Sequence, residues 1–266
     1  NDIIFEDIYR QVVAWLKIPQ GTTALDAGSG AGGFSAALAR AVGNDGSVTA
    51  LDSSVDLLEF AQSHLRASPY ASRVFFKQGD VNQLPFSDGS FDLVWSSRTI
   101  HHMKDQVEAI RQLVRVLRPA GRLAIREGVR DGRFLPDDIG ICPPGLHDRI
   151  NVAFNRWFYT NVRGGDALKY PFGWLRALAD AGLQNVTART FVLEGQPPFS
   201  EAQSRYMERQ LKRWVEDGDR RALLEHSDAR AMETLLDHHS EHYIRNRDDL
   251  HLVQLVTVYT GTTSAI

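Results

Sequence analysis

A loop with several glycines is the first stretch whose residue types could do chemistry. It lies in residues 24–34, which read ALDAGSGAGGF. Glycines between a strand and a helix let the chain turn tightly and let a ligand approach closer than a Cβ would allow. The amide groups at the start of the following helix can then bind a negative or polar group. Gly28 and Gly30 complete the dinucleotide pattern G-x-G-x-x-G with Gly33 and the looser G-x-G-x-G with Gly32. The loop therefore predicts a site for a nucleotide-type cofactor.

Two aspartates near this loop bear on which nucleotide it holds. Asp26 precedes the first glycine, where a carboxylate would repel the pyrophosphate of NAD or FAD. The same carboxylate suits the ammonium and sulfonium groups of S-adenosylmethionine, directly or through water. The alternative is that Asp26 is solvated or caps a helix. Asp52 ends a predicted strand about 20 residues after the loop, where a carboxylate accepts hydrogen bonds from the ribose of either cofactor.

Two histidines and a glutamate could move a proton. His101 and His102 follow the fourth predicted strand, and Glu127 ends the fifth. Open α/β sheets place their ligands at such strand ends. A histidine could take a proton from a phenol because its ordinary pKa is about 6.5. Packing or a contact with the cofactor is the alternative role for either histidine, and Glu127 is a further candidate base.

Strand and helix patterns alternate on both sides of these residues. Apolar residues at helical spacing predict helices at residues 3–17, 34–41, 54–67, 107–117 and 172–182. Short apolar runs predict strands at residues 22–27, 47–52, 73–80, 91–97, 121–128, 183–195 and 250–261. Such alternation predicts an α/β fold with a mostly parallel sheet and helices on both faces.

Two stretches break this alternation. Residues 129–170 contain Gly, Pro, Arg and many aromatic side chains without a clear period, and residues 199–249 are charged and helical. We expect the first stretch to form a lid over the acceptor and the second to be a helical insert. Both would belong to a single domain, residues 1–266, with its core at residues 20–128, 171–195 and 250–262.

Four motifs come in the order and spacing of a known family. They read LDAGSGAGG, VTALDSS, FKQGDVNQLPFSDGSFDLVWSSRTIHHM and RQLVRVLRPAGRLAI. Over residues 20–128 the chain resembles class I S-adenosylmethionine-dependent methyltransferases, and within them the ubiquinone/menaquinone-type and natural-product branch. The resemblance implies a Rossmann-like sheet of seven strands with an antiparallel last strand.

The same resemblance implies roles for individual residues around S-adenosylmethionine. Asp26, Gly28 and Gly30 would hold its methionine moiety, and Asp52 would bind the ribose with Ser53 beside it. The remaining cofactor-binding residues implied by the family are Asp80 on the adenine amino group, Val81 with its backbone N–H on the ring, Ser97 and Arg98 on the sulfonium side, and Tyr9 closing over the cofactor. A turn residue is the alternative for Asp80. Arg98 departs from the pattern because a cation beside a sulfonium is unfavourable, so we expect it to point away or to pair with a carboxylate such as Glu127.

The composition of the chain indicates which kinds of partner and which cellular compartment to expect. A net charge of -3 argues against a nucleic-acid partner. The single cysteine, Cys142, favours a reducing compartment. No apolar run reaches the length of about 20 residues that a membrane span needs, and no signal-peptide pattern is visible. We expect a cytoplasmic protein with a small-molecule partner, no resident metal, and a homodimer as a further option. His238 and His242 are best read as part of a solvated face.

Together these features predict methyl transfer from S-adenosylmethionine, leaving S-adenosylhomocysteine, to an oxygen or carbon of a small aromatic or polyketide-like acceptor. Alternatives are the same fold binding this cofactor for a non-methylating reaction, an NAD-dependent dehydrogenase, and a silent binding scaffold.

Overall fold

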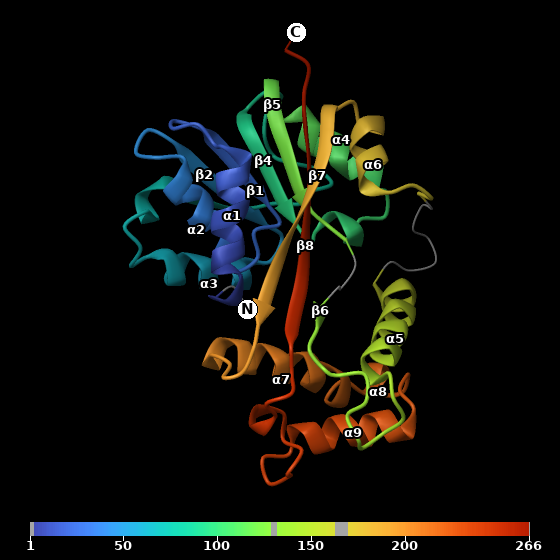
Figure 1. Ribbon diagram of the computed structural model, residues 1–266. Coiled ribbons are helices and arrows are strands. Elements are labelled where there is room, and N and C mark those ends of the chain that lie inside the picture. The colour runs from blue at the N-terminus through green and yellow to red at the C-terminus, as the bar shows by residue number, and fades with distance from the viewer. Residues whose placement is uncertain (1–2, 129–131, 163–169, 266) are drawn as a thin grey trace. The chain divides into compact units, whose positions relative to one another are not determined.

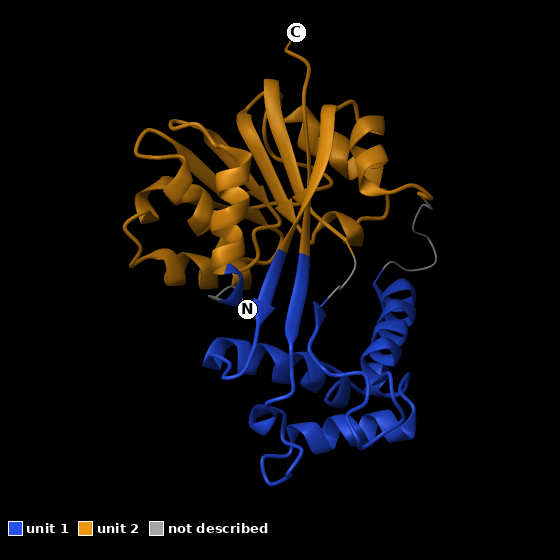
Figure 2. Cartoon of the chain, viewed as in Figure 1, with its two compact units in different colours: residues 1–5, 129–165, 192–255 blue, residues 6–128, 166–191, 256–266 orange. Residues whose placement is uncertain are grey.

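The computed structural model describes residues 3–128, 132–162 and 170–265. The chain divides into two compact units, coloured separately in Figure 2. Unit 1 comprises residues 1–5, 129–165 and 192–255, and unit 2 comprises residues 6–128, 166–191 and 256–266. The two stretches that break the strand–helix alternation therefore fall almost wholly in the same unit.

Unit 2 is built on a mostly parallel sheet. Its strands run in the order β3-β2-β1-β4-β5-β8, and β7 pairs with β8. Neighbours from β3 to β5 are parallel, whereas β5 and β8 are antiparallel. The strands are β1 (Thr23–Ala27), β2 (Ser47–Asp52), β3 (Val74–Gln78), β4 (Phe91–Ser97), β5 (Leu117–Arg126), β7 (Gln184–Gly195) and β8 (Leu252–Thr262).

This order confirms the predicted Rossmann-like sheet with an antiparallel last strand. The implied number of strands was too low by one, because the described residues also contain β6 (Gly132–Arg133), a two-residue strand that pairs with Val253 and Gln254 at the start of β8. Such a short strand carries too little sequence pattern to be predicted from periodicity.

Helices lie on both sides of the unit 2 sheet, with α1, α2 and α3 on one side and α4 and α6 on the other (Figure 1). Their bounds are α1 (Glu6–Leu16), α2 (Gly33–Ala41), α3 (Val55–Leu65), α4 (Gln106–Arg115) and α6 (Trp174–Asp180), with short 3-10 turns η2 (Ala71–Arg73) and η3 (Ile100–His102). Because side chains alternate along a strand, β1 serves both layers. Leu25 and Ala27 join the core cluster that includes α4 and α6, whereas Asp26 contacts α2.

Unit 1 is mainly helical. Its helices are η1 (Ile3–Phe5), α5 (Leu146–Asn161), α7 (Glu201–Val215), α8 (Gly218–Arg221), α9 (His226–Leu236) and η4 (Ile244–Asn246). Its core includes Leu211 and Trp214 of α7 and Met232 and Leu235 of α9, all buried. None of the helices in the part of the chain that the structure describes is long and apolar enough to cross a membrane.

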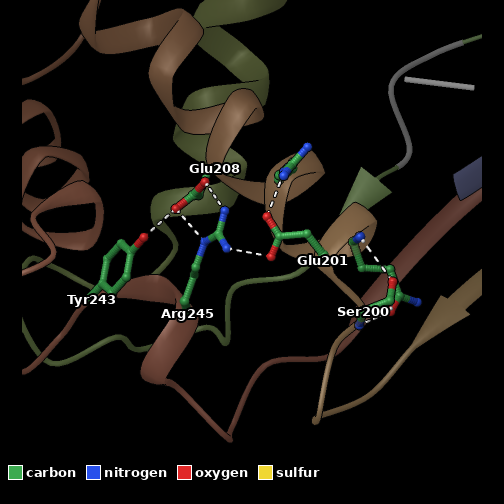
Figure 3. A network of polar contacts seen from close by, with 7 residues as sticks. Ser200, Glu201, Glu208, Tyr243 and Arg245 are labelled. Carbon is green, nitrogen blue, oxygen red and sulfur yellow. Dashed lines mark hydrogen bonds and ion pairs between the residues drawn. The ribbon is translucent and has the colours of Figure 1, made fainter. Parts of the chain in front are cut away.

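A network of polar and charged side chains joins α7 to the segment after α9 within unit 1 (Figure 3). Arg245 donates to Glu208 at 2.8 and 2.9 Å and to Glu201 at 2.8 Å, and Tyr243 donates to Glu208 at 2.6 Å. Ser200 caps α7 through a reciprocal pair of hydrogen bonds with Gln203. These contacts hold the segment after α9 against α7.

The helix α5 is the main element that the periodicity did not reveal. Its buried residues Leu146, Ile150 and Ala153 form a stripe at helical spacing over its first half only. Val152 and Tyr159 on the same helix are 70% and 63% exposed, and such exposed apolar residues obscure the period. Within unit 1, α5 is joined to α9 by Arg149, whose guanidinium donates to both carboxylate oxygens of Asp228 at 2.8 Å.

Candidate functional site

The glycine loop between β1 and α2 adopts a backbone that requires glycine. Gly28 has φ 76° and Gly32 has φ 79°, a left-handed region that residues with a Cβ rarely adopt. A Cβ on Gly28 would lie 2.2 Å from Oγ1 of Thr99. Gly33, in contrast, is the first residue of α2. The geometry therefore requires the glycines of G-x-G-x-G, whereas Gly33 takes an ordinary helical place.

Asp52 links the end of β2 to this loop. Its Oδ2 accepts a hydrogen bond from the N–H of Gly30 at 2.8 Å, and its Oδ1 accepts one from the N–H of Ser54 at 3.0 Å. Asp52 is half-buried and Ser53 is exposed. The structure thus brings Gly28, Gly30 and Asp52 together at the carboxyl edge of the sheet, which is where such folds bind ligands.

Asp26 is more enclosed than the sequence suggested. It is 1% exposed, and its Oδ2 accepts a hydrogen bond of 2.6 Å from Oγ of Ser35 in the first turn of α2. The carboxylate therefore ties β1 to the helix that follows the glycine loop. Contact with the methionine moiety stays a prediction for this residue.

Asp80 and Val81 follow β3, next to the end of β2. The N–H of Gly79 donates to the carbonyl of Asp52 at 3.0 Å, which connects the two strand ends. Asp80 is exposed, and its Oδ1 accepts from the backbone N–H and the side-chain amide of Asn82 at 2.8 and 2.9 Å. Asp80 thus lies in a turn, as the alternative interpretation of this residue expected. The turn uses Oδ1 of Asp80, and Oδ2 takes no part in it. Val81 is buried, and both cofactor roles stay predictions.

Tyr9, Ser97 and Arg98 occupy different surroundings. Tyr9 is 8% exposed and packs edge-on against Phe34, with ring centroids 5.2 Å apart. Ser97 ends β4 and is half-buried. Arg98 is exposed with φ 54°, and its N–H donates to the carbonyl of Arg126 at 2.9 Å. A left-handed non-glycine residue is strained, and such strain gathers at functional sites.

Glu127 is the centre of the polar contacts at this edge of the sheet. Its side chain is fully buried, and Oε1 accepts from the backbone N–H groups of Thr99 at 3.0 Å and Ile100 at 2.8 Å. Its Oε2 lies 2.6 Å from Nδ1 of His101. Glu127 therefore binds His101 and two amides, and the suggested pairing of Arg98 with Glu127 was wrong. The exposure of Arg98 agrees with the other expectation, that it points away.

His102 lies beside this pair with its own environment. Its ring centroid is 4.1 Å from that of His101. Partial burial of the ring lowers the pKa of His102, and the charge of His101 adds to this effect, which the charge of Glu127 opposes. The structure thus brings all three candidate bases together, but only His101 forms a hydrogen bond with Glu127.

Sequence reasoning missed several residues that shape the site. Thr99 limits the space at Gly28, and Ser35 holds Asp26. Parallel pairing of β1 with β4 could have placed Thr99 near the loop, whereas nothing in the sequence marks Ser35. Oγ of Ser29, within the loop, is buried without a hydrogen-bond partner. Among the described residues no cluster of His, Cys, Asp or Glu could hold a metal, His238 and His242 included.

These residues fit a nucleoside cofactor with a polar tail. Asp52 offers acceptor oxygens, Gly30 has open space where a Cβ would lie, and the buried hydroxyl of Ser29 is available to a polar group of a ligand. The fit concerns unit 2 alone, which contains every residue just described.

Comparison with known proteins agrees with this geometry. Residues 18–140 match a family model described as a methyltransferase domain. The 27-O-demethylrifamycin SV methyltransferase of Amycolatopsis mediterranei is 38% identical over 115 residues, which are 43% of this chain and 42% of that protein. The demethylmenaquinone methyltransferase of Lactobacillus johnsonii is 35% identical over 112 residues, 42% of this chain and 46% of that protein.

The chain thus spans less than half the length of these two curated relatives. Among solved structures, the YcgJ protein of Bacillus subtilis has a TM-score of 0.57 at 19% identity and is similar over 96% of this chain and 97% of that one. At that identity the likeness concerns the fold alone. The matched family model, together with the four motifs and the geometry of the loop, makes residues 18–140 similar to a methyltransferase domain.

Proposed function

We propose that the protein is an S-adenosylmethionine-dependent methyltransferase that acts on an oxygen or carbon of a small aromatic or polyketide-like acceptor. The observation that carries the proposal is the hydrogen bond from Gly30 to Asp52 across a loop in which Gly28 tolerates no Cβ. The names of the relatives support a small-molecule acceptor, since one is a methyltransferase of 27-O-demethylrifamycin SV and another of demethylmenaquinone.

S-adenosylmethionine supplies an activated methyl group on a sulfonium sulfur. In this site Asp52 would bind the ribose with Ser53 beside it, Asp80 and Val81 would bind the adenine, and the loop from Asp26 to Gly30 would hold the methionine end. Ser97 at the end of β4 and Arg98 after it would line the sulfonium side, with the Arg98 side chain pointing away, and Tyr9 would close over the cofactor. The protein's main task is then alignment of the acceptor atom with the methyl group.

Other properties belong to the same proposal. The net charge of -3 supports a small molecule rather than a nucleic acid as partner. Residues 129–170 remain our candidate for the acceptor lid, although residues 129–131 and 163–169 lie outside the described part of the chain. A cytoplasmic location, a homodimer and a single-domain organisation are further expectations that solution experiments can test.

Ligand-dependent unfolding tests the cofactor. A ligand present at 100 times its dissociation constant stabilises the folded state by about 2.7 kcal/mol. We expect S-adenosylmethionine and S-adenosylhomocysteine to raise the unfolding midpoint, and NAD and NADP to leave it unchanged. A shift with NAD alone would contradict the proposal, and no shift with any ligand would favour a scaffold without this cofactor.

The variant Asp52→Ala tests the site itself. It removes the carboxylate that reaches both the loop and the ribose, so we expect affinity for S-adenosylhomocysteine to fall at least tenfold, measured by calorimetry. Asp56→Ala is the matched control, since Asp56 is an exposed carboxylate in the first turn of α3. Equal affinity in both variants would remove Asp52 from the cofactor site.

A further inference from the structure

The contact between His101 and Glu127 has the geometry of an oriented base. Ser97 of β4 pairs with Arg126 of β5 in parallel register, so the residues that follow these two strands meet at one edge of the sheet. Glu127 comes directly after β5, and His101 lies in η3 after β4. Their hydrogen bond, 2.6 Å from Oε2 to Nδ1, therefore follows from the strand register.

The surroundings of Glu127 suit an anion. Two of its three described hydrogen bonds come from the backbone N–H groups of Thr99 and Ile100, and the third joins Oε2 to Nδ1 of the His101 ring. The carboxylate side chain is fully buried, whereas 21% of the His101 side chain is exposed. A carboxylate that only accepts fixes the hydrogen of the neutral ring on Nδ1, and proton exchange with another molecule then occurs at Nε2.

We propose that His101 is the general base of the reaction, that Glu127 is a positioning residue which sets the tautomer and orientation of its ring, and that the acceptor reacts through a phenolic or enolic hydroxyl. The inference rests on the proposed function. A base is needed only where the acceptor must lose a proton, and a phenol, with a pKa near 10, is within reach of an imidazole.

The step balances without a further reactant. The hydroxyl proton passes to Nε2 of His101 while the oxygen forms its bond to the methyl carbon. The bond between that carbon and the sulfur breaks, and its electron pair stays on sulfur, so a methyl ether and S-adenosylhomocysteine result. The imidazolium next to the Glu127 anion then returns its proton to water. Glu127 keeps its negative charge throughout, as in other oriented histidine bases.

The charges around His101 act in different directions. The Glu127 anion stabilises the imidazolium that the step creates. The ring of His102 lies 4.1 Å from that of His101, and the charges of Arg98 and Glu127 act on His102 in opposite directions. Of the two rings, that of His101 is the one with a described hydrogen bond to this carboxylate, so Glu127 orients His101 and not His102.

Nuclear magnetic resonance of histidine labelled with nitrogen-15 tests the base without knowledge of the acceptor. The full chain is titrated from pH 5 to 9 with S-adenosylhomocysteine bound. We expect the neutral His101 ring to carry its hydrogen on Nδ1, opposite to the tautomer favoured in solution. A ring with its hydrogen on Nε2, or one that stays an imidazolium up to pH 9, would overturn the assignment.

Glu127→Gln tests the positioning role. An amide can keep the backbone contacts but does not fix the same tautomer, so we expect the Nδ1–H signature of His101 to be lost while S-adenosylhomocysteine still binds. His251→Gln is a control outside the site, because His251 and Glu194 form an exposed pair at 2.8 Å in unit 1. If Glu127→Gln leaves the His101 tautomer unchanged, Glu127 is structural only.

Labelled-methyl transfer tests the acceptor class. The probes are phenols of one to three rings, each paired with the amine of the same skeleton. We expect transfer to oxygen, and at least a hundredfold loss in His101→Gln at pH 7 with cofactor affinity preserved. Transfer to the amines alone, to neither probe set, or loss of the base function in His102→Gln instead of His101→Gln would overturn the proposal. Failure to bind S-adenosylhomocysteine at all would instead refute the proposed function.

Discussion

At the scale of single residues, the site depends on close approaches between loops that follow different strands. Gly28 and Thr99 come from the ends of β1 and β4, and no Cβ fits between them. Glu127 directly follows β5, and its carboxylate accepts hydrogen bonds from the backbone N–H groups of Thr99 and Ile100. The register between neighbouring strands therefore determines where these polar groups lie.

Gly28→Ala should destabilise the protein by about 2 kcal/mol or more, because it combines a left-handed backbone with a clash. The added Cβ would lie 2.2 Å from Oγ1 of Thr99. Urea unfolding measures the loss. Gly30→Ala is the matched control, since its φ is also positive, 53°, but nothing lies within 4 Å of its Cβ, so we expect about 1 kcal/mol. Equal costs for the two variants would show that the approach of Thr99 is unimportant.

At the scale of elements, the strands and the helices between them were largely predictable, and α5 was not. The strand at residues 47–52 was predicted with the bounds that the structure has, because its apolar run and turn signals agree. The stripe of α5 ends halfway along the helix. The cofactor loop and Asp52 were predictable from the sequence because their spacing along the chain is local. The contact of His101 with Glu127 depends on the pairing of β4 with β5, which a single sequence does not show.

Asp228→Asn should destabilise unit 1 by about 3 kcal/mol, because the guanidinium of Arg149 on α5 loses its buried counter-charge on α9. The Asp228 side chain is 2% exposed and that of Arg149 33%, which limits the effect. Glu233→Gln serves as control, since Glu233 and Arg221 form a pair in which both side chains are about 40% exposed, and exposed pairs contribute less than about 1 kcal/mol. Hydrogen exchange of the α5 amides measures both variants, and equal effects would contradict the prediction.

At the scale of the whole molecule, the buried histidine His147 makes the stability of unit 1 depend on pH. In unit 1, burial lowers the pKa of His147, an effect that Arg133 reinforces and that Asp148 and the hydrogen bond to Gly132 oppose. Nε2 of this histidine lies 2.6 Å from the carbonyl oxygen of Gly132, and its Nδ1 is buried without a hydrogen-bond partner. The folded chain therefore resists protonation at this ring.

Unit 1 should lose stability as the pH falls below about 6.5, the ordinary pKa of histidine. Below this pH the unfolded chain binds a proton that His147 in the folded chain does not bind. Each further pH unit of acidification therefore lowers the free energy of unfolding by up to about 1.4 kcal/mol. Hydrogen exchange of α5 between pH 8 and pH 5, corrected for the intrinsic exchange rate, measures the effect. His147→Gln should flatten this dependence and His251→Gln should not. A dependence that survives in His147→Gln would assign it to other groups.

The composition of unit 1 from three separate stretches of chain, residues 1–5, 129–165 and 192–255, sets an order of events during synthesis. The five strands β1 to β5 are complete at residue 126, when most of unit 1 has not been made. Domains tend to fold as their residues leave the ribosome. The parallel part of the sheet can therefore form while β8, its antiparallel neighbour, is still untranslated. For that interval the outer side of β5 is an open edge that needs protection from pairing with another chain.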